Sequence, residues 1–215
     1  MRLVVTSDTH YPVADGVIPD GDIFVHAGDL MQNGYESEWK PCLEWIAKLQ
    51  HKLKFMVFGN HDHHPFLYPG PSLQNMRDIG VIVLGYPGNT NYYKYTLPNG
   101  MIIGGCPYVT GLPRWAFNTT EEKVENFLNS MGRVDILVTH SPAYGYLDKL
   151  SYFNEHVGIK AYNDYLLKWS PLLMFNGHVH EGYGGIVHPS GTKIFNVAMC
   201  DRKYKHSNPP MVIDL

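Results

Sequence analysis

Five short polar motifs follow hydrophobic runs along this chain, and together they hold the residue types that bind metal ions. They supply three carboxylates, one amide and five imidazoles, a donor set that suits two divalent cations held side by side. The motifs are Asp8-Thr9-His10, Gly28-Asp29, Gly59-Asn60-His61-Asp62, Thr139-His140 and Gly177-His178-Val179-His180.

The spacing within two of these motifs predicts paired ligands. Residues i and i+2 of a strand point to the same side. If strand geometry continues into the motifs, Asp8 and His10 converge on one point, and His178 and His180 converge in the same way. Each pair then grips a metal without any special backbone conformation.

Three further residues complete the predicted ligand set. Asp29 follows a glycine at the end of a predicted strand, where its two carboxylate oxygens could bridge two ions. Asn60 offers a neutral oxygen, and His140 an imidazole nitrogen. Mixed nitrogen and oxygen ligation without thiolate suits manganese, iron, zinc, cobalt or nickel, and we take manganese as the first candidate.

The charges of this site favour an anionic substrate. Asp8 and Asp29 would contribute two negative charges, whereas the histidines would bind as neutral imidazoles. Two divalent cations with a bridging hydroxide would therefore leave the site net positive. Two metals roughly 3.5–4 Å apart stabilise the attacking and leaving oxygens of an in-line displacement, and they lower the pKa of bound water towards about 7. The pattern predicts hydrolysis of a phosphate ester.

His61 is set apart from the predicted ligands by its neighbours, because it lies between Asn60 and Asp62. A histidine beside a carboxylate is held in one orientation and kept protonated, as the general acid for a leaving alcohol must be. His61 and Asp62 are therefore the predicted catalytic residues. Two other interpretations stay open, in which His61 is a further metal ligand or only a buried hydrogen-bond donor.

The elements that carry these motifs alternate between apolar runs and amphipathic stretches in the first half of the chain. Short apolar runs predict buried strands, and apolar residues at helical spacing predict helices. This alternation predicts a layered α/β fold with parallel strand pairing. The predicted strands are residues 3–7, 23–27, 55–58 and 81–84, and the predicted helices are residues 36–49 and 72–79.

The second half mixes hairpin signals with two more helices. Pro98-Asn99-Gly100 separates two strand-like runs and predicts a hairpin. Thr119 or Thr120 is the predicted cap of a helix whose first turn is acidic. The C-terminal runs at 184–187, 192–197 and 211–214 resemble hairpin strands. The remaining predictions are strands at 92–97, 101–105, 136–139 and 172–175, and helices at 120–131 and 160–169.

Composition places limits on the class of protein. The 215 residues predict one domain with a sizeable core. A net charge of −3 leaves no basic footprint for duplex nucleic acid. No apolar run is long enough for a membrane span, and a core strand directly after Met1 leaves no secretory signal. Three widely spaced cysteines are typical of reduced thiols in a cytoplasmic protein.

The ordered series of motifs resembles the calcineurin-like metallophosphoesterases. The resemblance runs from residue 8 to residue 180, so it spans most of the chain. It implies two packed mixed β-sheets flanked by helices, and it implies that His61 is the acid, oriented by Asp62. It also implies one metal bound by Asp8, His10, Asp29 and His180, and a second bound by Asp29, Asn60, His140 and His178.

A narrower resemblance points to the metallophosphoesterase-domain-containing branch, which is linked to hydrolysis of nucleotide phosphodiesters. The segment after Gly28-Asp29 lacks the Asp-Arg-Gly continuation of the Ser/Thr protein phosphatases, which argues against that activity. The stretches that carry the narrower resemblance are His140-Ser141-Pro142, Gly145-Tyr146-Leu147-Asp148, the run from Gly177 to Gly184, and Asn208-Pro209-Pro210.

The leading functional prediction is a dinuclear metal-dependent phosphodiesterase acting on a nucleotide or another small diester. A nuclease or phosphomonoesterase with the same metal core is the alternative among enzymes. A nucleotide-binding protein that keeps its metals for structure, with little turnover, is the alternative outside enzymes. The sequence does not distinguish oligomeric states.

Overall fold

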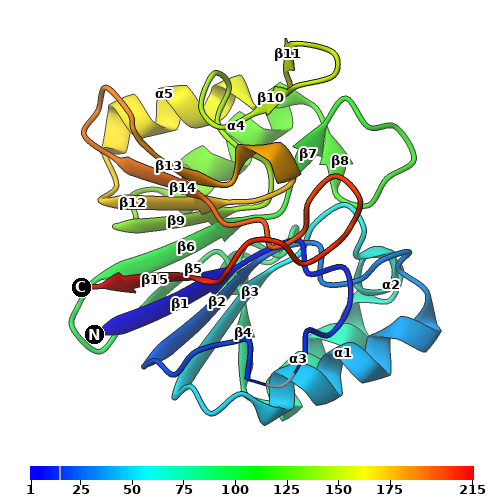
Figure 1. The fold of residues 1–215 in the computed structure, drawn as a ribbon. Coiled ribbons are helices and arrows are strands. Elements are labelled where there is room, and N and C mark those ends of the chain that lie inside the picture. The colour runs from blue at the N-terminus through cyan, green and yellow to red at the C-terminus, as the bar shows by residue number, and fades with distance from the viewer. Residues whose placement is uncertain (15) are drawn as a thin grey trace.

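Two mixed β-sheets stack face to face, and helices cover their outer faces (Figure 1). The computed structural model describes residues 1–14 and 16–215. The first sheet has the strand order β15-β1-β2-β3-β4, and the second has the order β13-β14-β12-β9-β6-β5. This arrangement confirms the predicted α/β fold of two packed sheets.

The first sheet is built from the N-terminal alternation of strands and helices. Its four parallel strands run in chain order, so each crossover carries a helix or loop. Helices α1 and α3 lie on its outer face (Figure 1). The elements are β1 (Arg2–Thr6), β2 (Ile23–Ala27), α1 (Glu36–Lys48), β3 (Leu53–Val57), α2 (His63–Leu67), α3 (Pro69–Asp78) and β4 (Val81–Val83).

The second sheet has a parallel centre and antiparallel edges. Strands β6, β9, β12 and β14 are parallel, whereas β5 and β13 pair antiparallel at the two edges. The elements are β5 (Lys94–Thr96), β6 (Ile102–Cys106), α4 (Glu121–Met131), β9 (Ile136–Thr139), α5 (Lys160–Trp169), β12 (Leu173–Asn176), β13 (Gly184–Val187) and β14 (Lys193–Asn196).

Four short strands and two 3-10 turns lie in the connections. Strands β7 and β8 pair parallel, and β10 and β11 form a small antiparallel pair. These connections matter for function because they surround the ends of the central strands. They are β7 (Val109–Thr110), β8 (Asn118–Thr119), β10 (Lys149–Leu150), β11 (Glu155–His156), η1 (Thr90–Tyr92) and η2 (His180–Gly182).

The core between the sheets is built from the inward faces of both. It joins Val25 and Phe55 of the first sheet to Val138 and Phe175 of the second, all fully buried. Burying each such side chain contributes about 1.5–3 kcal/mol. Because both sheets share this core, their strand ends are held in fixed relation to each other.

Strand β15 (Met211–Asp214) corrects one expectation. The sequence predicts that residues 211–214 join the C-terminal hairpin, but β15 crosses to the first sheet and pairs antiparallel with β1. The hairpin of β13 and β14 forms without it. β13 already occupies the outer edge of β14, whereas the edge of β1 is open. The two termini consequently lie side by side, with Leu215 N–H donating to Met1 O at 2.9 Å (Figure 1).

Among the described residues, no helix combines the length and the apolar character that a membrane span requires.

Candidate metal centre

The five polar motifs meet where central strands of both sheets end. Their backbones are tied directly to one another: Asp8 N–H donates to Gly28 O at 2.9 Å, and Gly177 N–H donates to His140 O at 2.9 Å. The carboxyl ends of parallel strands lie at the same edge of a sheet, and ligands of open α/β sheets bind there. The fold therefore collects residues as far apart in the sequence as Asp8 and His180.

The backbone that presents these residues is left-handed, which corrects the expectation of continuing strand geometry. β1 ends at Thr6, and Asp8 has a φ of 49° and His10 a φ of 50°. Asp29 and His178 also have positive φ, at 57° and 67°. Non-glycine residues rarely adopt this region, and such strained residues cluster at functional sites.

A first group of candidate ligands consists of Asp8, His10 and His180. Their ligand atoms all lie within 4.8 Å of one another. His180 Nε2 is 3.4 Å from Asp8 Oδ1, and it is 3.1 Å from His10 Nε2. Two imidazole nitrogens and a carboxylate facing one point form a donor set that a divalent cation fits.

A second group consists of Asp29, His140 and His178, again with ligand atoms within 4.8 Å of one another. His140 Nε2 lies 3.3 Å from Asp29 Oδ2 and 3.0 Å from Asn60 Oδ1. Asp29 also forms a group with His10 and His61, so its carboxylate lies between the two clusters. This position suits the bridging role predicted for it.

His178 and His180 do not converge on one point, contrary to the expectation from their spacing. His178 belongs to the group of His140, whereas His180 belongs to the group of Asp8. The reason is local. The backbone of His178 is in the left-handed region, and His180 begins the 3-10 turn η2. Their side chains therefore do not point to the same side, as residues i and i+2 of a strand would. Their division between two groups agrees with what the family resemblance implies.

Backbone carbonyls orient three of the histidines for metal binding. The Nδ1 atoms of His10, His140 and His180 lie 3.2, 3.0 and 2.8 Å from the carbonyl oxygens of Met31, Ala27 and Asp201. A carbonyl only accepts, so each Nδ1 carries a proton and donates it. This arrangement leaves Nε2 as the metal-binding nitrogen, which is the usual support for a metal-ligating histidine.

The glycines of the motifs are required by close approach. A side chain at Gly177 would overlap the Asp8 carboxylate and the Ser7 side chain. A side chain at Gly59 would overlap the Asp29 carboxylate and lie 2.6 Å from Asp29 N. Each of these two glycines therefore leaves room for a ligand that comes from a different motif.

Replacing Gly177 by alanine is expected to damage the first ligand group. The new methyl group would displace the buried Asp8, at a cost of about 1–3 kcal/mol in the free energy of unfolding. Denaturant unfolding and metal content measure the two effects. Gly70→Ala in α3 is the matched control, because nothing lies within 4 Å of its added carbon. A Gly177→Ala protein with unchanged stability and metal content would contradict this account.

The contacts of Asp62 correct the predicted orientation of His61. The Asp62 carboxylate is fully buried and accepts from the backbone N–H groups of Asp29, Met31 and Gly59, at 3.1, 3.0 and 2.8 Å. It therefore ties two motif loops together and does not hold the His61 ring. His61 Nδ1 instead lies 2.5 Å from the carbonyl oxygen of Gln32, which accepts its proton.

Asp62 is also electrostatically unusual. Burial raises its pKa to about 7, and the nearby Asp29 carboxylate adds to the shift, although backbone hydrogen bonds from Gly59 and Met31 oppose it. Burial therefore favours the neutral acid at Asp62, whereas the backbone hydrogen bonds favour the charged carboxylate.

Two carboxylate–imidazole pairs dominate the electrostatics of the ligand groups. Burial acts to raise the pKa values of Asp8 and Asp29, but facing histidines outweigh it, and both values lie well below the ordinary range. Burial likewise acts to lower the pKa values of His140 and His180, but the carboxylates raise both to about 9. Without metal, each pair is an ion pair at neutral pH.

The other two histidines behave differently. Burial lowers the pKa values of His10 and His178 to about 4. These imidazoles are neutral at pH 7 and need lose no proton to bind a cation.

A cavity of about 210 Å³ opens over the ligand groups, and two of its lining residues, Arg202 and Tyr204, carried no sequence signal. Glu181 and Arg202 form an ion pair with Nε 3.2 Å from Oε1. The centre of the Tyr204 ring lies 4.7 Å from the centre of the His10 ring. Arg202 and Tyr204 lie in the loop before β15 but in none of the motifs, so only the fold reveals their place.

The histidines outside the motifs are expected to be structural residues, with His63 and His64 open as substrate contacts. His26 is buried, with Nε2 3.1 Å from Thr9 Oγ1. The ring centres of His64 and Trp39 are 5.4 Å apart, and those of His63 and Trp115 are 5.6 Å apart. Trp115 also packs against His61 at 4.6 Å, so His63 is the nearer of the two to the ligand groups.

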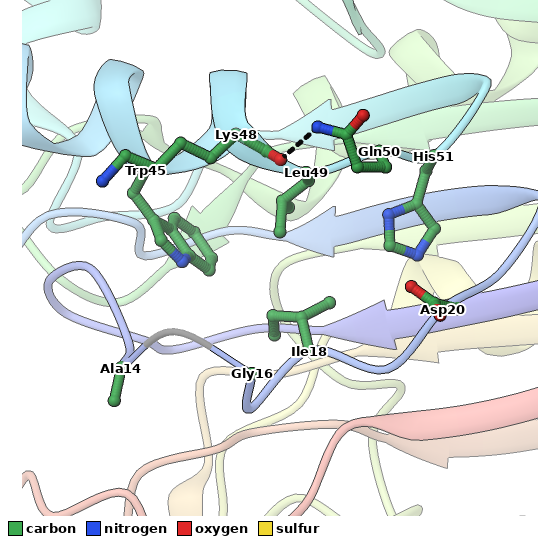
Figure 2. A pocket seen from close by; sticks show the side chains of 9 residues that line it. All are labelled: Ala14, Gly16, Ile18, Asp20, Trp45, Lys48, Leu49, Gln50 and His51. Atoms are coloured by element: carbon green, nitrogen blue, oxygen red, sulfur yellow. Dashed lines mark hydrogen bonds between the residues drawn. The ribbon is translucent and has the colours of Figure 1, made fainter.

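A separate pocket of about 400 Å³ lies where β2 and β3 begin, beside the end of α1 (Figure 2). Trp45 and Ile18 face each other across it, and Gln50 donates to the Lys48 carbonyl at 2.8 Å. In the described part of the chain, no predicted metal ligand or catalytic residue lines this pocket. It is therefore distinct from the cavity over the ligand groups.

The sequence and fold together define the class of protein. The family model of the calcineurin-like phosphoesterases matches residues 1–182, and the chain belongs to this family. It is 30% identical to metallophosphoesterase domain-containing protein 1 of Homo sapiens, over all of this chain and 71% of that protein. It is 29% identical to a UPF0046 protein of Caenorhabditis elegans, over 99% of this chain and 74% of that protein.

Solved structures share the fold at low identity. The protein TT1561 of Thermus thermophilus superposes with a TM-score of 0.64 and 13% identity, covering 99% of this chain and 98% of that one. A dimetal phosphatase from Danio rerio superposes with a TM-score of 0.57 and 13% identity, covering 98% of this chain and 91% of that one. At such identities the likeness concerns the fold.

Proposed function

We propose that this protein is a dinuclear metal-dependent phosphodiesterase acting on a nucleotide or another small diester. The observation that carries the proposal is the pair of ligand groups with Asp29 between them, since Asp29 groups with His140 and His178 and also with His10 and His61. Family membership supports phosphoester hydrolysis, and the dimetal phosphatase with the same fold is compatible with two metals. The preference for diesters rests only on what the narrower resemblance to the metallophosphoesterase-domain-containing branch implies.

The metals would be held by the residues already described. Asp8, His10 and His180 would hold one ion, and Asn60, His140 and His178 would hold the other, with Asp29 between them. When bound, two divalent ions supply Lewis acidity towards the phosphoryl oxygens and an activated water nucleophile. Nitrogen and oxygen donors without thiolate favour manganese as the first ion to test, with iron, zinc, cobalt and nickel as alternatives.

The chain's own residues would provide orientation and a proton. The Gln32 carbonyl fixes the His61 ring by accepting from Nδ1, so in its doubly protonated form His61 would donate the Nε2 proton to the leaving oxygen. The backbone N–H of His61 donates to Asp29 Oδ1 at 2.8 Å. This hydrogen bond ties the proposed acid directly to the carboxylate that lies between the two metals. Arg202 lies at the cavity wall, where its guanidinium is paired with the Glu181 carboxylate.

We infer a small phosphoester as the partner and the cytoplasm as the location. The net charge of −3 argues against duplex nucleic acid. The three cysteines are free and buried, which fits a reducing compartment.

Metal analysis paired with hydrolysis tests the proposal. The protein is reconstituted with manganese, and turnover of bis-p-nitrophenyl phosphate is compared with that of p-nitrophenyl phosphate. Two metals per chain and faster diester turnover are expected. Faster monoester turnover would replace the diester preference, and two metals without turnover of either compound would favour a binding protein. A chain that takes up no metal would overturn the proposal.

Replacing His61 by asparagine should separate the acid role from a ligand role. If His61 protonates the leaving group, kcat for an alkyl diester should fall by about 10²–10⁴-fold. The fall should be much smaller for p-nitrophenyl esters, whose leaving group is already a stable anion. Metal content should stay at the wild-type value, and loss of metal in this variant would identify His61 as a ligand instead.

A further inference from the structure

A second hollow, which we call the side pocket, opens beside the metal centre and has a volume of about 510 Å³. Its walls include Leu112, Tyr144, Val157 and Lys160, and His178 lines both it and the cavity over the ligand groups. The two spaces therefore share a wall. Pockets for small molecules have volumes of roughly 300–1,000 Å³, so the side pocket has room for part of a substrate bound at the metals.

The walls of the side pocket have the chemistry of a ring-binding site. Leu112, Val157 and Val179 present aliphatic surface, and Tyr144 presents a ring that is 39% exposed. Lys160 Nζ lies over that ring, 5.2 Å from its centre, and the His156 ring packs against it with ring centres 5.6 Å apart. An aromatic guest could stack on the part of the Tyr144 ring that these two side chains leave exposed, and the lysine could attract an electron-rich edge of the guest.

Asp148 holds the loop that forms one wall of the side pocket. Its carboxylate is fully buried. It accepts from Gly145 N–H at 3.0 Å, from Gly158 N–H at 2.9 Å and from His156 Nδ1 at 2.6 Å. A buried and satisfied polar network of this kind rigidifies the loop.

The backbone of Tyr144 is fixed by a second set of contacts. Tyr144 N–H donates to Ile159 O at 3.1 Å, and Ile159 N–H donates to Pro142 O at 2.9 Å. Gly158 allows this approach, because an added carbon there would lie 2.6 Å from Ala143 O and from Tyr144 N. A ring platform that is ordered before binding avoids the entropy cost of ordering it.

We propose that the side pocket binds an aromatic or heteroaromatic ring carried by the phosphoester, with Tyr144 as the stacking residue. The substrates are then phosphoesters with a ring near the phosphorus, in preference to small alkyl esters. This inference rests on the proposed phosphoesterase function, because the phosphate would be held at the metals. Tyr144 acts in specificity and takes no part in the chemical step.

Binding of phosphonates to the manganese-loaded protein tests the side pocket without any turnover. Phenylphosphonate and 2-phenylethylphosphonate place a phenyl ring at two different distances from the phosphorus, whereas methylphosphonate carries the same phosphonate group without a ring. Calorimetry should show at least one aryl phosphonate binding about tenfold tighter than methylphosphonate. Tyr144→Ala should remove this preference and leave the affinity for methylphosphonate unchanged, whereas Tyr144→Phe should keep the preference.

Tyr95→Ala is the matched control, because Tyr95 is 37% exposed and lies on edge strand β5 outside the side pocket. It should bind all three phosphonates as the wild type does, and metal content is measured for every variant. Equal affinities in the wild type, or a preference that survives in Tyr144→Ala, would overturn the side-pocket assignment. Turnover of bis-p-nitrophenyl phosphate tests the proposed function separately, since a diesterase without ring preference refutes only the pocket.

Discussion

Asp29→Ala should abolish diester hydrolysis while the fold survives. The Asp29 carboxylate belongs to the second ligand group, forms a further group with His10 and His61, and lies 3.3 Å from His140 Nε2. Removing it should weaken both ions at once, and the loss of several kcal/mol of transition-state stabilisation corresponds to at least about a thousandfold in kcat/KM. Hydrolysis of bis-p-nitrophenyl phosphate and metal analysis of the same sample measure the effect.

Two further variants make the Asp29 result decisive. Asp29→Asn keeps the shape of the side chain and removes its charge, so it should also lose activity if the charge matters. Asp164→Ala removes an exposed carboxylate from α5 and should match the wild type. Circular dichroism checks the fold of each protein. Full activity in a folded Asp29→Ala protein would refute the shared-carboxylate site.

Metal binding at pH 7 should displace two imidazolium protons per chain, the water that becomes the bridging hydroxide should release a third, and binding should weaken as the pH falls. His140 and His180 have pKa values raised to about 9 in the metal-free protein, so each carries a proton that a cation must displace. Each ion should then bind about tenfold more weakly for every pH unit below about 9. Above that pH the imidazoles are already neutral, and the dependence should flatten.

Calorimetric titration in buffers of different ionisation enthalpy counts these protons. Two of the released protons are expected to come from imidazoliums rather than four, because His10 and His178 have pKa values of about 4 and are already neutral. His156 lies outside both ligand groups, so the His156→Asn protein should release the same number of protons on metal binding. Release of no imidazolium proton, or of four, would contradict the ion pairs described for the metal-free site.

The sequence predicted the frame of the fold because apolar runs encode buried strands locally. The apolar run at 23–27 coincides with β2, and that at 136–139 coincides with β9. The partner of β15 was not predictable in this way, because a short apolar run does not say which open edge it will fill. Helix α2 was also missed, since five residues beginning with two histidines and a proline give no periodic signal.

The candidate ligands were recognisable for a different reason. Carboxylates and imidazoles after buried strands have few structural uses, and the fold does bring them into two groups. The paths that bring them together were not predictable, because Asp and His adopt the left-handed region more often than most residues but still only in a minority of cases, so residue type alone did not place Asp8 there. Arg202, Tyr204 and the hydrogen bonds of Asp148 depend on contacts between distant loops, which single-sequence patterns do not encode.

The pairing of β1 with β15 also orders events during folding. The side chains of Arg2 and Asp214, which this pairing brings together, are 212 positions apart, and contacts of such separation form slowly. During synthesis β1 emerges before every other strand, and β15 emerges after all of them. The Asp201 carbonyl that orients His180 lies just before β15. A nascent chain that has completed β12 already contains every candidate ligand except His178 and His180. Its site is still incomplete until the segment around Asp201 has been synthesised, because the Asp201 carbonyl orients His180.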